Sequence, residues 1–243
     1  MPNIVGVFIA LTALSLIGYA NDSGCHALLH DTLDEVSVHQ ESILVGLVQV
    51  GYQHHVCLGI ENPDAEILTR RVSVDSRSLS VGELVQQMLP PGRRYTITEE
   101  NGVVLIRGKE PVVAKSWLDE HVPSFEVPRA SVQEVSNALY MTIAMLADPS
   151  IQGFAGTHRT GDPGDKVGPI SEHGRTLREL LNVILIGSGG GTWISSTCSR
   201  ADSEITQRPC WTTIQYTEPL SSVLQLANIV VDEHKQKSQA PRK

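Results

Sequence analysis

The hydrophobic and polar positions of this chain follow the same order of elements twice. In the first copy, residues 35–39 (EVSVH) alternate between polar and apolar side chains, which predicts a strand, and residues 42–52 (SILVGLVQVGY) are apolar around most of a helix. Gly46 and Gly51 lower the helix propensity of residues 42–52. Residues 56–60 (VCLGI) suit a buried strand, and residues 71–75 (RVSVD) alternate again. The pattern predicts strand, helix, strand and strand, in that order.

A helix start and a hairpin complete the first copy. Ser80 and Glu83 have the spacing of a capping box, in which each side chain accepts a backbone N–H of the helix start. Two prolines and a glycine then end the predicted helix. Residues 95–98 and 103–106 are two β-rich runs joined through Asn101–Gly102, a dipeptide typical of tight hairpin turns.

The second copy repeats this order. A strand is predicted at residues 124–127 (SFEV), and Ser131 with Glu134 forms a second capping box that opens a helix to about residue 146. Thr176 with Glu179 forms a third box. The remaining expected elements are a short strand at 151–155, a strand entered near 167–170, a helix stop at the glycines of 187–191, a hairpin of 192–198 with 210–216, and a last helix within 219–233.

This repetition predicts an α+β protein made of two small two-layer sandwiches. Each has the order strand–helix–strand and then strand–helix–hairpin. The expected boundaries are a leader at 1–20, a first module at 35–108, a linker at 109–123, a second module at 124–218, and a C-terminal helix with a basic tail at 219–243. Because the carboxylates of Glu83, Glu134 and Glu179 recur with the scaffold, capping explains them better than acid–base catalysis does.

The pattern resembles a known family. Residues 124–128 (SFEVP) before a capped helix, together with 72–74 (VSV), 79–85 (LSVGELV), 95–97 (YTI) and 103–106 (VVLI), resemble the short N-terminal domain shared by secretins and TonB-dependent outer-membrane receptors. The resemblance implies two such modules, no catalytic residues, and a periplasmic role in signalling or assembly through binding other proteins. It does not extend to a secretin pore or a receptor barrel, so roles in secretion or iron uptake are not implied.

The N-terminal segment predicts export. Residues 4–20 carry no charged side chain, Asn21 and Asp22 end the run, and Gly18 and Ala20 are placed like the small residues before a cleavage site. A signal peptide puts the protein outside the cytoplasm, in a bacterial periplasm or secreted. The segment lacks the Lys or Arg of a typical leader, so a retained N-terminal membrane anchor is the alternative, although the run is short for a bilayer span.

Charge limits the partners. The formal net charge is -8 and the basic residues are scattered, which disfavours a nucleic-acid partner. The basic stretch 234–243 has the composition of a disordered end. We expect another envelope protein or a second copy as partner, and a membrane contact only through a retained N-terminal segment.

The four cysteines favour disulfides in an exported chain. Cys198 and Cys210 lie in the two runs of the predicted second hairpin and could face each other across it. Cys25 and Cys57 are the remaining pair. Unpaired thiols are the alternative for both pairs, as is a lipidated Cys25, although Asp22 stands where a lipidation signal has an aliphatic residue.

Catalytic motifs are missing from the sequence. It contains no nucleophile elbow, zinc-protease motif, paired-cysteine motif or phosphate loop. His54, His55 and Cys57 are metal-ligand types, but adjacent histidines in a strand point to opposite faces, so no metal or cofactor is assigned.

The sequence therefore favours an exported, non-enzymatic protein-interaction or assembly module that works through exposed sheet edges or helix faces. The alternative is a hydrolase-like envelope enzyme with a site between the modules near the loop 156–168. His158, Asp162 and Asp165 of that loop would be its candidate residues.

Overall fold

The computed structural model of the chain describes residues 25, 28–92, 94–108, 117–147, 166–198 and 208–215. The protein is of the α+β class, as predicted. The helices of these residues are α1 (Ile43–Gln53), α2 (Ala65–Thr69), α3 (Val81–Met88), α4 (Val132–Ala147) and α5 (Leu177–Gly187), with a 3-10 turn η1 (Trp117–Asp119). The strands are β1 (Thr32–Leu33), β2 (Val36–Ser42), β3 (Cys57–Glu61), β4 (Arg71–Ser76), β5 (Leu79–Ser80), β6 (Tyr95–Glu100), β7 (Val103–Gly108), β8 (His121–Val127), β9 (Ala130–Ser131), β10 (Lys166–Val167), β11 (Ile170–Thr176), β12 (Gly191–Cys198) and β13 (Arg208–Gln215).

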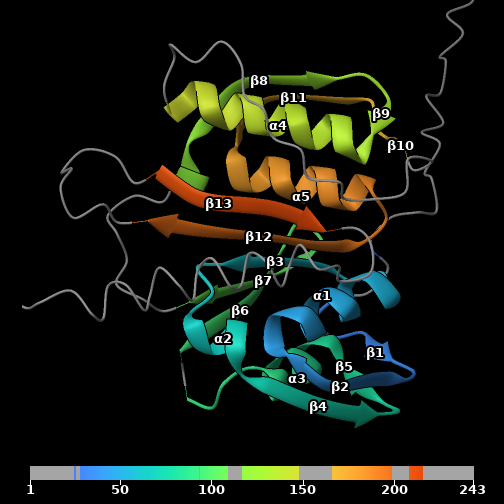
Figure 1. Cartoon of the computed structure of the whole chain (residues 1–243). Coiled ribbons are helices and arrows are strands. Elements are labelled where there is room, and N and C mark those ends of the chain that lie inside the picture. Colours follow the sequence, from blue (N-terminus) through green and yellow to red (C-terminus); the bar gives the residue numbers. More distant parts are fainter. Residues whose placement is uncertain are drawn as a thin grey trace, which may run out of the picture.

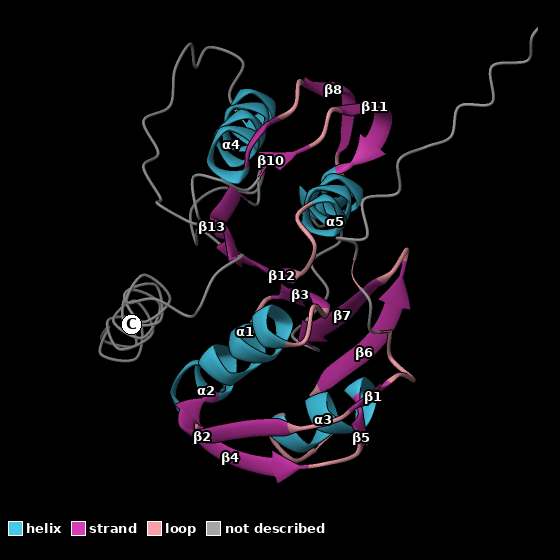
Figure 2. Cartoon of the chain, turned by 90° about the vertical axis from the view of Figure 1, so that its right-hand side faces the viewer, coloured by secondary structure: helices cyan, strands magenta, loops and turns pink. Residues whose placement is uncertain are grey.

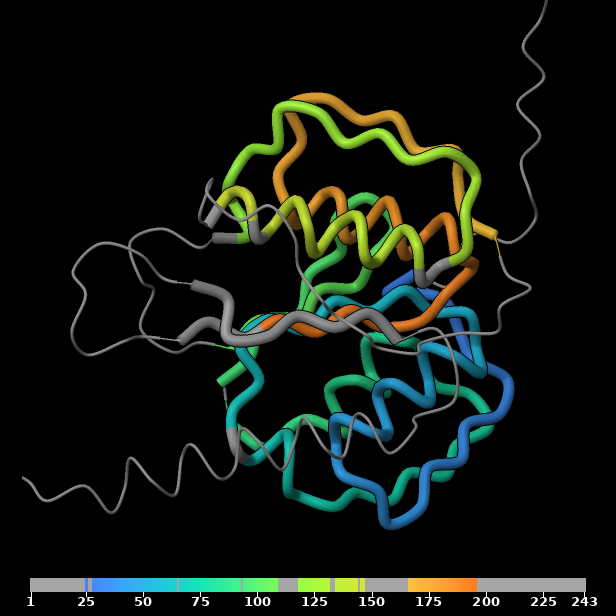
Figure 3. Tube along the Cα trace, turned by 45° about the horizontal axis from the view of Figure 1, so that its top comes forward, coloured from blue at the N-terminus to red at the C-terminus, as the bar shows by residue number. Residues whose placement is uncertain are grey.

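These elements stack in layers around one central sheet (Figure 1). We call β2 to β7 with their helices the first unit, and β8 to β13 with theirs the second unit. Helices α1 and α3 lie on one side of the central sheet, with the antiparallel pair β2–β4 outside them (Figure 2). Helices α4 and α5 lie on the other side under the antiparallel pair β8–β11. The tube view shows the two units above and below the central sheet (Figure 3).

The central sheet draws strands from both units. Its order is β13-β12-β3-β7-β6. Within the first unit, β3 pairs with β7 in parallel and β7 pairs with β6 as an antiparallel hairpin. Strand β12 of the second unit pairs with β3 in parallel, and β13 forms a hairpin with β12. The main elements of the first unit follow the expected order, and those of the second unit follow it except for the strand expected at 151–155, which lies outside the described residues. The two units share a sheet that a separate sandwich would not have.

Strand β7 shows why its sequence is apolar without interruption. Val104 and Ile106 point into the core of the first unit, whereas Val103 and Leu105 point into the core of the second. Both faces of the strand are covered by helices, so every side chain from Val103 to Ile106 is buried.

The predicted local signals form as expected. Ser80 and Thr176 are the N-cap residues of α3 and α5, and both close complete capping boxes with the glutamate three residues later. Ser131 exchanges the same two bonds with Glu134 at the start of α4. Asn101 and Gly102 both have positive φ, 54° and 79°, which is the geometry of the tight turn that their dipeptide predicts.

Helix α1 forms despite its two glycines because both allow close packing. A Cβ at Gly46 would lie 2.5 Å from Cε of Met88, and a Cβ at Gly51 would lie 2.7 Å from Oγ1 of Thr192. The propensity cost of the glycines is offset by burial, since Ile43, Leu44 and the other apolar residues of α1 are almost fully enclosed.

Some elements differ from the sequence pattern or lie outside it. The pattern does not predict α2 or the short pairs β1–β5 and β9–β10. Strand β8 begins at His121, inside the expected linker. The expected leader 1–20, the strand 151–155 and the helix within 219–233 lie outside the described residues. Among the residues that are described, no helix has the length and hydrophobicity to cross a membrane.

Candidate functional site: the junction between the two units

The junction is a parallel strand pair formed by segments far apart in the sequence. Gly191 to Ser195 of β12 lie opposite Cys57 to Glu61 of β3. The Gly191 N–H donates to the Val56 carbonyl at 3.3 Å, and the Asn62 N–H donates to the Ser195 carbonyl at 2.8 Å, at the two ends of the ladder. The second unit is thus joined to the first by strand addition at a sheet edge.

Glycines let the two units approach closely. A Cβ at Gly59 of β3 would lie 2.4 Å from Cζ2 of Trp193, so the indole of the second unit occupies the space that a side chain would need. Gly190 has a φ of 130°, and a Cβ there would lie 2.9 Å from the His55 Cα. Larger side chains at these positions are incompatible with the junction as it stands.

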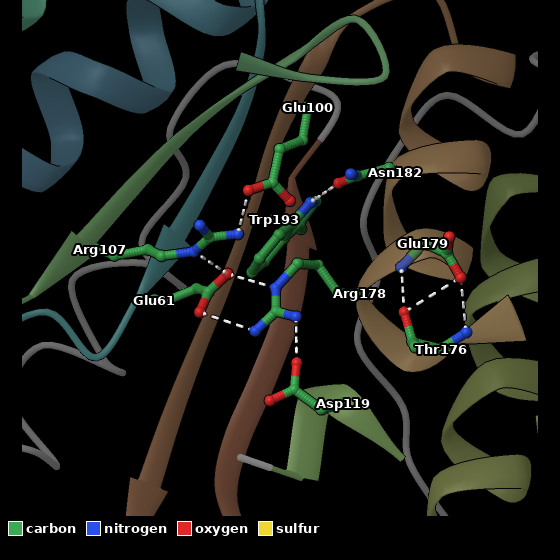
Figure 4. A network of polar contacts seen from close by, with 9 residues as sticks. All are labelled: Glu61, Glu100, Arg107, Asp119, Thr176, Arg178, Glu179, Asn182 and Trp193. Carbon is green, nitrogen blue, oxygen red and sulfur yellow. Dashed lines mark hydrogen bonds and ion pairs between the residues drawn. The ribbon is translucent and has the colours of Figure 1, made fainter. Parts of the chain in front are cut away.

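Trp193 anchors this contact from β12. Its side chain is fully buried, and its indole N–H donates to Oδ1 of Asn182 in α5 at 2.9 Å (Figure 4). Asn182 is itself only 2% exposed. A buried donor and a buried acceptor therefore satisfy each other within the second unit, and the apolar ring remains available to pack over β3.

A network of charged side chains crosses the junction beside Trp193. Nε of Arg178, in the first turn of α5, lies 2.7 Å from Oε1 of Glu61 at the end of β3, and Nη2 lies 3.2 Å from Oε2. Arg178 also pairs with Asp119 of η1. Arg107 of β7 contacts the same carboxylate at 3.1 Å and the Glu100 carboxylate at 2.7 Å (Figure 4).

This network joins the two units through one buried carboxylate. The Glu61 side chain is 7% exposed and receives three N–H contacts from two guanidinium groups. Burial of Arg178 lowers its pKa, but hydrogen bonds and the charges of Glu61 and Asp119 outweigh that effect, so its pKa is raised overall. The Glu61 carboxylate is therefore held by side chains from both units.

A disulfide lies at the same junction. Cys57, the first residue of β3, is joined to Cys25 with a Cα–Cα distance of 5.5 Å. Although Cys57 belongs to β3 of the first unit, its side chain is fully buried in the core of the second unit. Cys25, which precedes the first unit in the sequence, is partly buried and packs against the same core. The thiolate of Cys57 is consequently not available as a metal ligand.

The second expected disulfide stays a prediction. Cys198 lies opposite Arg208 in the β12–β13 register. Cys210 falls between Pro209 and Trp211, where the register shifts at a bulge. The side chains of both cysteines lie outside the described part of the structure.

The recurring glutamates act as helix caps. The Ser80 backbone and side chain donate to Glu83, which lowers the pKa of that carboxyl. Hydrogen bonds from Ser131 and Thr176 lower the pKa of Glu134 and Glu179 in the same way. A depressed pKa keeps these carboxylates ionised, which agrees with their assignment to capping.

The two histidines near Cys57 do not belong to a metal-binding group among the described residues. His55 has a positive φ of 52° and its Nδ1 lies 3.0 Å from the Gly189 carbonyl. Burial, and then the neighbouring His55, lower the pKa of His54. No group of three or more His, Cys, Asp or Glu side chains among the described residues is arranged to hold a metal ion.

One exposed cluster has the composition of a catalytic triad but a different geometry. Oγ of Ser37 lies 2.8 Å from Nε2 of His39 and donates to Oδ1 of Asp75 at 2.9 Å. Asp75 approaches the same Nε2, at 3.4 Å. In a triad the carboxylate bonds the ring nitrogen that the serine does not use, so this arrangement cannot relay a proton from the serine.

The remaining sequence candidates cannot be placed. His158, Asp162 and Asp165 of the predicted loop lie outside the described residues, and only the end of that loop is described, as β10 and its neighbours.

Sheet edges remain open in the described part of the structure. Strand β6 ends the central sheet, and no other strand among the described residues pairs with its outer side. In a two-residue hairpin the pair flanking the turn, Glu100 and Val103, is hydrogen-bonded. The N–H and C=O groups of Glu100, Thr98 and Thr96 therefore point to β7, and those of Glu99, Ile97 and Tyr95 point outward.

The residues of the charged network could not be found from the sequence. Glu61 is a charged residue at the end of an apolar run, and Arg178 lies inside a capping-box segment. Each is ordinary at its own position, and 117 residues separate the two. Only the pairing of β12 with β3 brings them together.

Comparison of the chain with protein-family models, with curated proteins and with solved structures finds no match.

Proposed function

We propose that this chain is an exported, non-enzymatic protein-interaction or assembly module of the cell envelope. The observation that carries the proposal is the junction itself, because the chain already uses strand addition at a sheet edge to join two folded units. The same backbone chemistry is available at the outer edge of β6.

Three further observations support this role. The main elements of the first unit follow the order that the resemblance to the short N-terminal domains of secretins and TonB-dependent receptors implies. The capping glutamates and the Glu61 network have roles in folding and docking. The Cys25–Cys57 disulfide fits an oxidising compartment, as expected for an exported protein.

The test is affinity capture from an envelope extract with the purified protein as bait. We expect a partner that free protein displaces, or a second copy of the chain. The control bait is Gly59→Leu, which the fold cannot accommodate beside Trp193 and which should lose any partner that recognises the folded units. The proposal is refuted if the wild-type bait retains nothing that free protein displaces and the chain shows no self-association.

A further inference from the structure

We propose that the outer edge of β6 joins two copies of this chain as an antiparallel, two-fold pair centred on Ile97. This inference rests on the proposed function, since it names the partner that one sheet edge takes. It is argued from the repeat relation between β6 and β12, from the open backbone groups of β6, and from the sequence of that strand.

Strand β6 is the counterpart of β12. The same number of residues separates the N-cap Ser80 from Tyr95 as separates the N-cap Thr176 from Gly191. Ile97 therefore corresponds to Trp193. Both side chains point toward the helices of their own unit, since Ile97 packs on the core of the first unit and Trp193 lies in the core of the second.

Corresponding residues of β6 and β12 also turn their N–H and C=O groups to the side opposite the hairpin partner. In β12, Gly191 and Ser195 bond to Val56 and Asn62, the residues that flank the neighbouring strand β3. Their counterparts in β6 are Tyr95 and Glu99, which point outward and make no backbone hydrogen bond with another described residue. The β6 edge is thus of the type that already forms a junction within this chain.

A head-to-tail repetition of that junction is disfavoured. In the internal junction, α1 approaches β12 so closely that a Cβ at Gly51 would lie 2.7 Å from Thr192. The residue at the same distance from the N-cap in α4 is Tyr140. Tyr140 has a large side chain where Gly51 has none, which disfavours the same close approach of a strand to α4.

The sequence of β6 is instead complementary to itself. When two copies pair in antiparallel orientation about Ile97, Thr96 lies opposite Thr98 and Tyr95 lies opposite Glu99 of the other copy. All outward groups then meet in hydrogen-bonded pairs, which gives about six backbone hydrogen bonds. A two-fold contact needs one patch that matches itself, and this strand meets that requirement.

The side chains and charges agree with this register. In this register Thr96 of the second copy lies opposite Thr98, as in the cross-strand Thr–Thr pairs of other sheets. The two Glu99 carboxylates lie about 14 Å apart, beyond the screening length at physiological salt, so their repulsion is small.

The test measures the mass of the purified protein by sedimentation equilibrium across a wide concentration range. We expect an equilibrium between one and two chains. Glu99→Pro removes an outward N–H from each copy without touching the bonds to β7, and should weaken the dimer by about tenfold or more. Glu99→Gln is the matched control, because it keeps that N–H and an acceptor for the Leu29 N–H, and should dimerise like the wild type.

Cross-linking tests the register independently of the proline variant. A mixture of Thr96→Cys and Thr98→Cys chains should form a covalent dimer under mild oxidation, whereas either variant alone should not exceed the wild-type background. A chain that stays monomeric, a folded Glu99→Pro chain that dimerises normally, or assemblies larger than a dimer would each refute the two-fold pair. A monomer that still captures another envelope protein would refute self-pairing and leave the proposed function standing.

Discussion

Arg178 of the second unit and Glu61 of the first form a two-point ion pair across the junction, with Nε to Oε1 at 2.7 Å and Nη2 to Oε2 at 3.2 Å. The side chains are 15% and 7% exposed, so solvent screens the pair weakly. The pair therefore couples the two units more strongly than a surface salt bridge would.

Replacing Arg178 by alanine should destabilise the folded chain. Glu61 keeps Arg107 but loses its best-aligned partner, and an under-compensated buried carboxylate costs about 2–4 kcal/mol. Urea unfolding measures this loss. The control is Arg175→Ala, since Arg175 pairs with Glu172 at an exposed position and should change the unfolding free energy by less than about 1 kcal/mol. Equal losses in the two variants would contradict a special role for the Glu61 pair.

Gly51→Ala should also destabilise the protein, against the expectation from helix propensity. In a free helix this change gains about 1 kcal/mol. Here the new Cβ would lie 2.7 Å from Thr192 Oγ1 and 2.9 Å from the Gly191 carbonyl oxygen, so the junction must shift, at a cost of about 1–3 kcal/mol. Thermal unfolding gives the sign of the change. A more stable variant would mean that the two units do not pack as closely as described.

The capping carboxylates predict how stability depends on acidity. Hydrogen bonds from the cap residues hold the folded-state pKa of Glu83, Glu134 and Glu179 below the usual value. The unfolded chain then binds more protons as pH falls, so their contribution is complete above pH about 4.5 and is lost as pH drops through the lower folded-state pKa values.

Unfolding free energies measured from neutral pH to pH about 3 test this dependence. A variant with glutamine at all three positions keeps a side-chain acceptor at each cap but cannot titrate there. It should show a flatter decline over the acid range than the wild type. Identical pH profiles for the two proteins would show that other groups control the acid sensitivity.

Reduction of the Cys25–Cys57 disulfide should lower stability. The two cysteines are 32 residues apart in sequence, and opening a loop of that length costs about 3–4 kcal/mol in the chain-entropy account. Unfolding with and without a thiol reductant measures the effect. The part of the reductant response that comes from this disulfide should be missing from the variant with alanine at both Cys25 and Cys57, and should remain in the variant with alanine at both Cys198 and Cys210.

The sequence predicts local signals better than features that depend on packing. Capping boxes at Ser80, Ser131 and Thr176, and the turn at Asn101–Gly102, are local signals, and each appears as expected. Helix α2 is missed because it has a single Asp64 cap and little apolar periodicity. The glycines of α1 argue against a helix on propensity, and only the closely packed neighbours explain them.

Local sequence patterns predict the longer helices and strands, the three capping boxes, the tight turn and the α+β class, because each depends on residues a few positions apart. The tertiary structure alone decided that β12 pairs with β3, that Trp193 covers Gly59, and that Arg178 meets Glu61. Those contacts join segments more than a hundred residues apart, and strand edges carry the same backbone groups whatever their sequence. Which edges meet depends on the shape and burial of both units together, and no local pattern contains that information.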